Sequence, residues 1–205
     1  MTSGHAPRLT AHGVEHLRWA LARHRAEGGW HTILVPLPPR CAARTVARPG
    51  VVFDPPSGDG MVGIGVARAF TCDDGGLERV RAVAARHYDA IRVLAAADQS
   101  AGTTGHAPWI GGAAFAPGPM RDPAWSGFAA TAFSVPRWTL RHGSGGWTAI
   151  LTVGPDVASA AQTDALLDEW ALLTRPASPP TEDAPSWRVT PAPSPAADDG
   201  WPERI

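Results

Sequence analysis

The stretch Val51–Phe70 constrains the fold more than any other part of this 205-residue chain. It reads VVFDPPSGDGMVGIGVARAF, in which two apolar runs flank a turn rich in proline and glycine. Prolines lack an N–H donor and glycines tolerate a positive φ, so the middle of the stretch is suited to reversing the chain. We therefore predict a strand at Val51–Phe53, a polar turn at Asp54–Gly60 and a second strand at Met61–Ala67.

The second strand of this hairpin alternates large and small residues. Val62, Ile64 and Val66 are expected on one face, because side chains alternate across a strand. The glycine and alanine residues between them are expected on the other face. A face of small residues lets another backbone layer or a ligand approach closely.

The segment Gly58–Gly63 also matches the G-x-G-x-x-G pattern of dinucleotide-binding loops. Such a site requires the glycines to open a helix whose N-terminus meets the pyrophosphate. A β-rich segment follows here, so we interpret the pattern as a hairpin turn. A P-loop is excluded because all 18 basic residues are arginine and the chain has no lysine.

The composition is that of a folded domain without electrostatic bias. Hydrophobic residues make up 44% of the chain, and the formal net charge is −1. This balance gives no reason to expect a nucleic acid or an anionic membrane as a partner. The first residues carry no signal-peptide pattern and no run approaches a membrane span, so we expect a cytoplasmic location. Cys41 and Cys72 are too few for a disulfide framework, and we expect free thiols.

Hydrophobic periodicity predicts an α+β fold, with a mainly antiparallel sheet and packed helices. Helices are expected at 10–26, with Thr10 as N-cap, at 77–97 and at 159–173. Strands are expected at 30–37, 109–115, 130–141 and 147–153, the last two joined by a glycine turn. Pro136 favours an edge position or a bulge in the third of these. The apolar stripes of the first two helices include His24 and His87.

Composition divides the chain near Arg175. We expect one α+β domain at residues 1–174 and a proline-rich linker at 175–205, where packable aliphatic side chains are scarce. This linker leads only to the short segment Trp201–Ile205. We therefore expect the chain to stop where a further domain would begin.

The histidines do not predict a metal site. His12 and His16 lie four residues apart on the first expected helix, but the H-E-x-x-H signature is absent. A solvated helix face explains this pair better than a metal. We interpret His31, His106 and His142 as isolated surface or loop residues.

Serines and acidic pairs are likewise better explained by turns. Ser57 and Ser144 lie in glycine-rich turns, and no G-x-S-x-G nucleophile elbow occurs. Asp73–Asp74 and Asp198–Asp199 could touch a cation, but magnesium sites combine carboxylates with bound substrate, so solvated turns explain them better. We therefore assign no catalytic residue and no metal ligand, and leave the substrate-binding residues unknown.

Aromatic side chains could line a pocket or fill the core: Trp109, Phe115, Trp125, Phe128, Phe133 and Trp138. Tryptophan at strand spacing is more often part of the core. Arg137 could hold an anionic substrate through two hydrogen bonds, although a surface ion pair explains it better. One open hypothesis is a small aromatic acid held among Trp109, Trp138 and Arg137.

The order of the motifs resembles the N-terminal half of isochorismate synthases, which belong to the chorismate-utilising enzyme family. The matching segments are a G-x-G-x-A strand at Gly63–Ala67, a G-G-x-A-F strand at Gly111–Phe115 and an F-x-x-P-R strand at Phe133–Arg137. The similarity extends over about Arg40–Trp201. The L-L-E-S motif of anthranilate synthases is not found, which favours isochorismate synthase within the family.

This resemblance implies part of a large two-lobed α/β enzyme that converts chorismate to isochorismate with Mg²⁺, in menaquinone or siderophore biosynthesis. In that family a lysine base, an acid and the magnesium ligands lie in the C-terminal half. The present chain has no lysine and ends about where that half begins, so no family catalytic residue transfers to it.

We therefore expect a truncated protein that acts as scaffold, is inactive alone and has no cofactor of its own. Its expected partner is the missing chorismate-binding half, and exposed apolar surface should favour association. The alternative is a stand-alone module that binds a small molecule or complements a separate catalytic chain.

Overall fold

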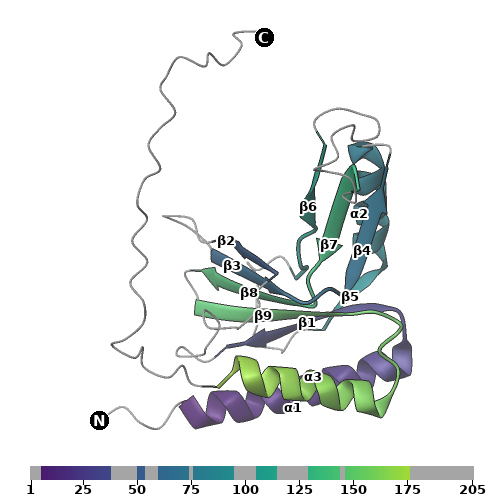
Figure 1. The fold of residues 1–205 in the computed structure, drawn as a ribbon. Helices are drawn as coiled ribbons and strands as arrows, with labels where there is room; N and C mark the ends of the chain where they lie inside the picture. The colour runs from purple at the N-terminus through teal and green to yellow at the C-terminus, as the bar shows by residue number, and fades with distance from the viewer. Residues whose placement is uncertain are drawn as a thin grey trace, which may run out of the picture.

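The computed structural model describes residues 6–37, 50–53, 60–73, 76–94, 105–114, 129–143 and 146–175. Within these ranges the chain forms three helices and two sheets (Figure 1). The expected linker beyond Arg175 lies outside the described residues. No helix in the described ranges is long and apolar enough to cross a membrane.

The larger sheet has six strands in the order β2-β3-β8-β9-β1-β5. These strands are β1 (Trp30–Pro36), β2 (Val51–Phe53), β3 (Gly60–Ile64), β5 (Ile91–Leu94), β8 (Trp138–Gly143) and β9 (Gly146–Val153). Neighbours in this sheet are antiparallel except β1 and β5, which run parallel. The sheet is therefore mixed, within the α+β class that the sequence predicts.

The smaller sheet is antiparallel, in the order β4-β7-β6. Its strands are β4 (Arg68–Cys72), β6 (Ile110–Ala113) and β7 (Thr131–Val135). Helix α2 (Leu77–Ala90) contacts this sheet through a hydrogen bond between Arg68 of β4 and His87. Together the smaller sheet and α2 form a second lobe beside the six-stranded sheet, as Figure 1 shows.

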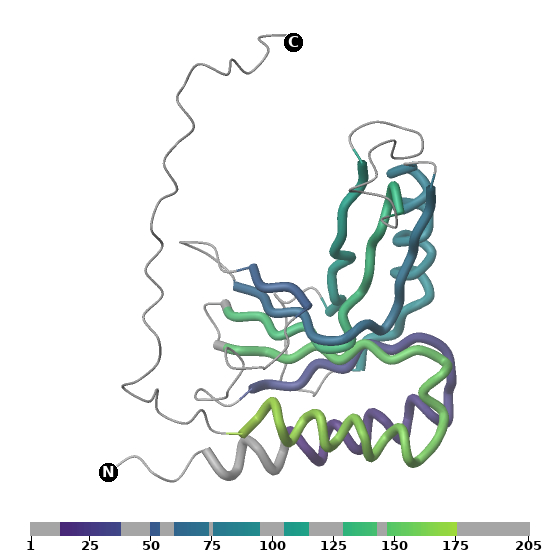
Figure 2. Tube along the Cα trace, viewed as in Figure 1, coloured from purple at the N-terminus to yellow at the C-terminus, as the bar shows by residue number. Residues whose placement is uncertain are grey.

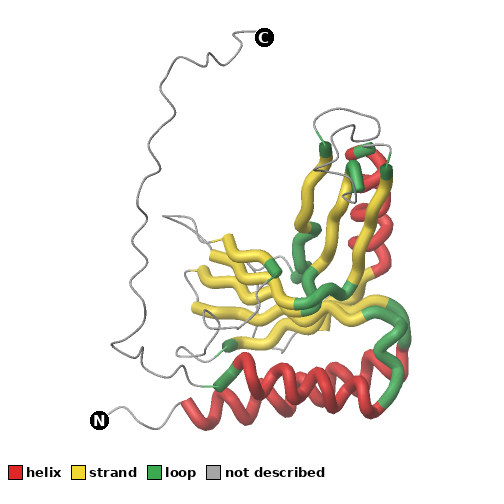
Figure 3. The backbone as a smooth tube through the Cα atoms, viewed as in Figure 1, coloured by secondary structure: helices red, strands yellow, loops and turns green. Residues whose placement is uncertain are grey.

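Helices α1 (Ala6–Glu27) and α3 (Ala160–Leu173) cover one face of the six-stranded sheet (Figure 3). They come from opposite ends of the described chain and pack side by side, as the purple and yellow-green tubes in Figure 2 show. Between the helices and the sheet are buried Leu21, Ile33, Leu151, Trp138 and Trp170. Each large aliphatic side chain buried in this way contributes about 1.5–3 kcal/mol.

Local capping signals fix the ends of these helices. Ser159, at the predicted start of the third helix, is the N-cap of α3, because its hydroxyl accepts from the backbone N–H of Gln162 at 3.2 Å. The Gln162 side chain accepts in return from the backbone N–H of Ser159 at 2.9 Å. Gly28 and Gly29 end α1 with φ values of 64° and 85°, which glycine adopts readily.

Two helix boundaries differ from the prediction. Helix α1 begins at Ala6, so Thr10 lies within the helix and is not its N-cap. Helix α2 ends at Ala90 and not near 97. The following residues Ile91 and Val93 are β-branched, and pairing beside β1 converts the predicted last turns of the helix into β5.

The predicted strand at 130–141 is two strands that belong to different sheets. Strand β7 ends at Val135, and β8 starts at Trp138 after Pro136, which has no N–H for a ladder. The predicted strand at Met61–Ala67 likewise ends at Ile64, because Gly65 turns the chain with a φ of 64°. The predictions of one continuous strand at 61–67 and at 130–141 were therefore wrong at the points where the chain passes between the two sheets.

The prediction of close approach at the small residues is confirmed at one position. A Cβ atom added to Gly63 would lie 2.9 Å from Cγ of Pro136. The last four residues of the G-x-G-x-x-G pattern, Gly60–Gly63, lie in strand β3 and do not open a helix, as expected for a hairpin. Val66, predicted to lie on the same strand face as Val62, lies beyond the end of the strand and is exposed.

Candidate functional site

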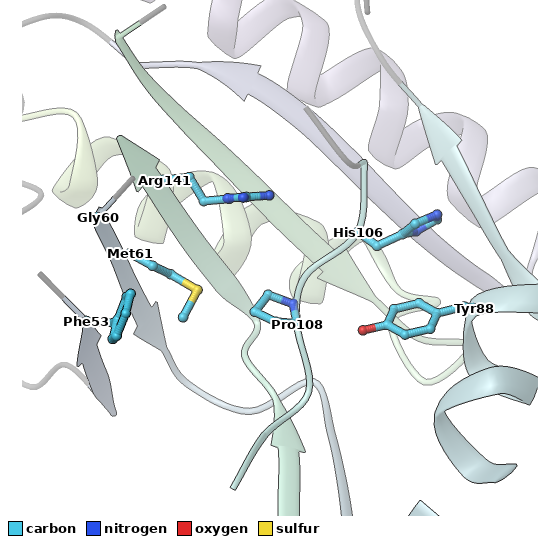
Figure 4. Close-up of a pocket in the computed structure, with 7 residues that line it drawn as sticks. All are labelled: Phe53, Gly60, Met61, Tyr88, His106, Pro108 and Arg141. Atoms are coloured by element: carbon cyan, nitrogen blue, oxygen red, sulfur yellow. The ribbon is translucent and has the colours of Figure 1, made fainter. Parts of the chain in front are cut away.

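A cavity of about 540 Å³ lies beside the edge of the six-stranded sheet that β2 and β3 form (Figure 4). It is lined by Phe53 of β2, Gly60 and Met61 of β3, Tyr88 of α2, His106 and Pro108 of the segment before β6, and Arg141 of β8. Its wall thus combines segments that are far apart in the sequence. Sheet pairing brings them together, since Met61 is the register partner of Arg141.

The cavity has one apolar and one polar side. Phe53 and Met61 lie together in Figure 4, while Tyr88 and His106 lie across from them, beyond Pro108. The Arg141 side chain extends from β8 over the same space. A volume of this size, with an apolar wall and a few polar groups, suits a small organic molecule. An arginine favours a molecule that carries a carboxylate or another anionic group.

Tyr88 and His106 are held in fixed positions. The Tyr88 hydroxyl donates to the carbonyl oxygen of Ala107 at 3.3 Å, and its ring lies 5.4 Å from that of His106. Burial raises the pKa of Tyr88, so its hydroxyl stays protonated at neutral pH. Tyr88 can therefore present a neutral hydroxyl to a ligand.

A cluster of cationic and aromatic side chains surrounds His87, the neighbour of Tyr88 on α2. Arg68 Nη1 donates to His87 Nδ1 at 3.0 Å, because a guanidinium can only donate. The guanidinium carbon lies 5.2 Å from the ring centroid of Trp30 and 5.9 Å from that of Trp109, within cation–π range. Burial, with smaller contributions from Arg68 and His106, lowers the pKa of His87 to about 4, so the ring is neutral at pH 7.

These contacts determine where the proton of the neutral His87 ring sits. Since Nδ1 accepts from Arg68, the proton is on Nε2. That buried N–H has no acceptor among the described residues, and the same holds for the indole N–H of Trp109. Buried N–H groups are nearly always hydrogen-bonded. Both N–H groups therefore require an acceptor that the described residues do not supply.

The two faces of the six-stranded sheet differ in polarity. Trp138 and Leu140 of β8 belong to the core under the helices, so Thr139 and Arg141 lie on the opposite face by alternation. Buried threonines on three adjacent strands, Thr32, Thr139 and Thr152, have hydroxyls with no partner among the described residues. The face away from α1 and α3 is therefore the more polar one, and Arg141 on this face lines the cavity.

The structure does not bring together the aromatic-acid site expected from the sequence. The Trp138 ring stacks on Trp170 in the core, with ring centroids 5.8 Å apart, and its N–H donates to Glu169 at 2.7 Å. Arg137 Nη1 donates to the other oxygen of Glu169, also at 2.7 Å. The ion-pair interpretation of Arg137 is thus confirmed, and Trp109 lies in the separate cluster around Arg68.

The interpretation of His31 as a surface or loop residue was wrong. Its side chain is fully buried in β1 and contacts His24 of α1. His106 does lie in a loop, but it lines the cavity beside Tyr88. His142 is exposed at the end of β8, 5.0 Å from the Trp147 ring, and His16 stacks on Trp19 at 5.6 Å.

Of the remaining expected residues, Cys72 is buried, Asp73 is exposed and Phe133 is half-buried. Several others lie outside the described residues or have side chains outside them: His12, Cys41, Ser57, Asp74, Phe115, Trp125, Phe128, Ser144, Asp198 and Asp199. Sequence reasoning missed Tyr88 and Arg141. The available signals were that Tyr88 is the chain's one tyrosine and that Arg141 precedes a glycine turn.

Comparisons with known proteins give no identification. A search of protein-family models found no match to this chain, and a search of curated proteins found no significant match. Within the described ranges, no three histidine, cysteine or acidic side chains are grouped so that they could hold a metal ion. The assignment of a function therefore rests on the motif order and on the geometry given above.

Proposed function

We propose that this chain is the N-terminal half of an isochorismate synthase-like protein and that it supplies scaffold, not reacting groups. One structural observation carries most weight in support. The six-stranded sheet is covered by α1 and α3 on one face, whereas its other face holds buried hydroxyls that have no partner among the described residues. The order of the G-x-G-x-A, G-G-x-A-F and F-x-x-P-R segments supports the same family.

Exposed apolar side chains at the sheet margins support a role in packing against another polypeptide. Val52 and Phe53 of the edge strand β2 are 59% and 57% exposed, and Val93 of the opposite edge strand β5 is also exposed. Edge strands with apolar side chains are sites at which a further chain can pair. A chorismate-binding half that continues the sheet or covers its second face would bury these residues.

The side chains around the cavity do not provide the chemistry of the reaction. Moving a hydroxyl group around the chorismate ring requires a base, an acid and a cation held by carboxylates. Arg141, Tyr88 and His106 include no carboxylate, so the donor set does not suit Mg²⁺. In this proposal the base and the magnesium ligands come from the other half, and the present chain is inactive alone.

A reconstitution experiment tests this proposal. The purified chain is incubated with chorismate and Mg²⁺, alone and together with a separately produced C-terminal half of an isochorismate synthase, and isochorismate is quantified by chromatography. We expect no turnover from the chain alone, and a stable complex with higher turnover than either half. Turnover by the chain alone at ordinary enzyme rates would overturn the scaffold role, and failure to form any complex would overturn the pairing.

The cavity favours a second candidate function, a module that binds a small acidic molecule. Arg141 can pair with a carboxylate while Phe53 and Met61 contact an apolar ring. Calorimetric titration with chorismate, and with benzoate as a simpler aromatic acid, tests this function. We expect Arg141→Gln to weaken binding at least tenfold and Arg81→Gln, an exposed arginine on α2, to leave it unchanged. No heat change at millimolar ligand would exclude the binding module.

A further inference from the structure

Two fully buried histidines form a second polar cluster, outside the residues that line the cavity. His24 of α1 is 1% exposed and His31 of β1 is 0% exposed. Their Nδ1 atoms are 3.0 Å apart, and the rings meet edge to face at 84°. The other nitrogen of each ring also has a partner: His24 Nε2 lies 3.0 Å from the carbonyl oxygen of Val157, and His31 Nε2 lies 3.4 Å from Oε2 of Glu27.

Both ends of this row are hydrogen-bond acceptors. The carbonyl oxygen of Val157 can only accept. Glu27 is ionised, because a hydrogen bond from Arg23 at 2.6 Å lowers the pKa of its carboxyl to about 2, and hydrogen bonds from His31 and Arg92 act in the same direction. Arg92 Nη1 of β5 donates to Oε2 of Glu27 at 3.1 Å. The histidine pair therefore faces an acceptor at each end.

The three contacts in this row can all be hydrogen bonds only if the pair carries three ring protons. Two neutral imidazoles carry two protons. The three contacts are those of His24 with Val157, of the two Nδ1 atoms with each other, and of His31 with Glu27. If the pair carries two ring protons, lone pairs face each other at one of these contacts. If the pair carries four ring protons, the Nδ1–H groups of His24 and His31 face each other.

We propose that the His24–His31 pair holds three ring protons and acts as a pH-sensitive clamp between α1, β1 and the β9–α3 connection. In this arrangement His24 has its proton on Nε2 and accepts at Nδ1. His31 has protons on both nitrogens, one donated to His24 and the other to Glu27. The pair carries one positive charge beside the Glu27 carboxylate, which Arg23 and Arg92 also contact.

The surroundings of His24 agree with a single proton on that ring. Burial lowers the pKa of His24, and the neighbouring His31 lowers it further. The carbonyl groups of Val157 and Gly154 and the carboxylate of Asp156 act in the opposite direction. A lowered folded-state pKa means that the contribution of His24 to stability is present above the unfolded value of 6.5 and is lost as the pH falls.

The clamp therefore has two pH limits. On the acidic side, a fourth proton on His24 breaks the contact between the Nδ1 atoms. On the alkaline side, release of the third proton leaves lone pairs opposed at one of the three contacts. Because the third proton is bound in the folded state, its contribution to stability is lost as the pH rises through the point at which it leaves. The segments that the clamp joins are held most firmly between these limits.

Ring nitrogen chemical shifts test the proton count directly. The full chain is labelled with ¹⁵N-histidine, and the signals of the pair are assigned with His24→Gln and His31→Gln. We expect both nitrogens of His31 and one nitrogen of His24 to be protonated at neutral pH, and one of these protons to be lost on raising the pH. A pair with only two protonated nitrogens throughout the neutral range would overturn the clamp.

A charge variant provides an independent test. Glu27→Gln keeps the size of the side chain but removes the negative charge beside His31. We expect the third proton then to leave at a pH lower by about 1–3 units, because an opposite charge at this distance favours the protonated form by that amount. His142→Gln, which removes an exposed histidine, is the matched control and should leave both pH limits in place. An unchanged alkaline limit in Glu27→Gln would contradict the proposal.

Discussion

The six-stranded sheet and the smaller sheet are stabilised in different ways. The first buries a continuous apolar core against two helices, in which Leu17, Ile33 and Trp170 are fully enclosed. The second meets the first through a small apolar cluster of Val135, Ala107 and Ile150 of β9, and α2 is held to it by the contacts of Arg68 with His87. Apolar burial needs no exact geometry, whereas a polar cluster depends on each of its partners.

This difference indicates which region of the molecule depends on its surroundings. In the smaller sheet, Gly112 of the edge strand β6 is exposed, and a Cβ added to it would meet nothing within 4 Å. In the six-stranded sheet, the central strands are buried on both faces, and the exposed apolar residues Val52, Phe53 and Val93 lie on the edge strands β2 and β5. We therefore expect the larger layer to fold with its own contacts and the smaller one to gain stability from a bound partner.

The largest expected effect comes from removing a side chain from the larger core. Trp170→Ala deletes the ring that stacks on Trp138 and should lower the free energy of unfolding by about 3–5 kcal/mol. Leu172→Ala, at a 59% exposed position of the same helix, should change it by about 0.5 kcal/mol or less. Chemical denaturation measures both. Equal effects of the two variants would show that this core does not dominate stability.

Acidification should affect the smaller sheet next. The pKa of His87 is about 4 in the folded protein against an ordinary value of 6.5, so its contribution to stability is present above pH 6.5 and is lost as the pH falls towards 4. The full loss is about 3 kcal/mol, since each pH unit corresponds to about 1.4 kcal/mol. Hydrogen exchange of the backbone amides in β4 and β7, followed as the pH is lowered, measures this loss of stability.

Replacing the titrating ring sharpens this prediction. His87→Asn keeps an acceptor for Arg68 but cannot gain a charge at acidic pH. The pH dependence of exchange in β4 and β7 should therefore be flatter in this variant than in the unchanged protein. Protection of those amides that persists down to pH 4 in the unchanged protein would contradict the assignment to His87.

A smaller effect is expected where the chain passes between the sheets. Gly63→Ala places a Cβ 2.9 Å from Cγ of Pro136 and should cost about 1–3 kcal/mol through crowding. The matched change Gly112→Ala adds the same methyl group in open space and should not incur that cost. Thermal unfolding compares the two variants. A Gly63→Ala protein as stable as the unchanged one would mean that the crossing adapts without strain.

The smallest effect on stability should come from the exposed edge strand. Phe53→Ser removes an apolar ring that is 57% exposed and should change the free energy of unfolding by about 0.5 kcal/mol or less. The same variant should associate less in light scattering, because the apolar edge is reduced. A fall in stability without any change in association would show that Phe53 packs inside the fold.

The sequence predicted helix ends well where residues close in the sequence determine them. The glycines after α1 and the capping box at the start of α3 each act within a few residues, and the helix ends there lie close to the predicted bounds at 26 and 159. The end of α2 and the break at Pro136 were missed because strand pairing decides them. His31 was misread for a related reason: a central strand is covered on both faces, so even a polar residue in it is buried.

The cavity could not be predicted from the sequence for the same physical reason. Met61 and Arg141 are register partners on β3 and β8, although 80 positions separate them in the sequence. Tyr88 and His106 reach the site from two further segments. Neither Tyr88 nor His106 lies in a recognised motif. Pairing between distant strands leaves no local sequence pattern, so the sequence does not indicate that these four side chains meet.

Two of the passages between the sheets, from β3 to β4 and from β7 to β8, run side by side. The backbone N–H of Ala67 donates to the carbonyl oxygen of Val135 at 2.9 Å, and that of Arg137 donates to Gly65 at 3.4 Å. The backbone N–H of Thr152 also donates to the carbonyl oxygen of Arg137 at 2.8 Å, which anchors one passage to β9. These two backbone segments are thus hydrogen-bonded to each other where they connect the lobes. A force that pulls the lobes apart would therefore act on both segments together and not on either one alone.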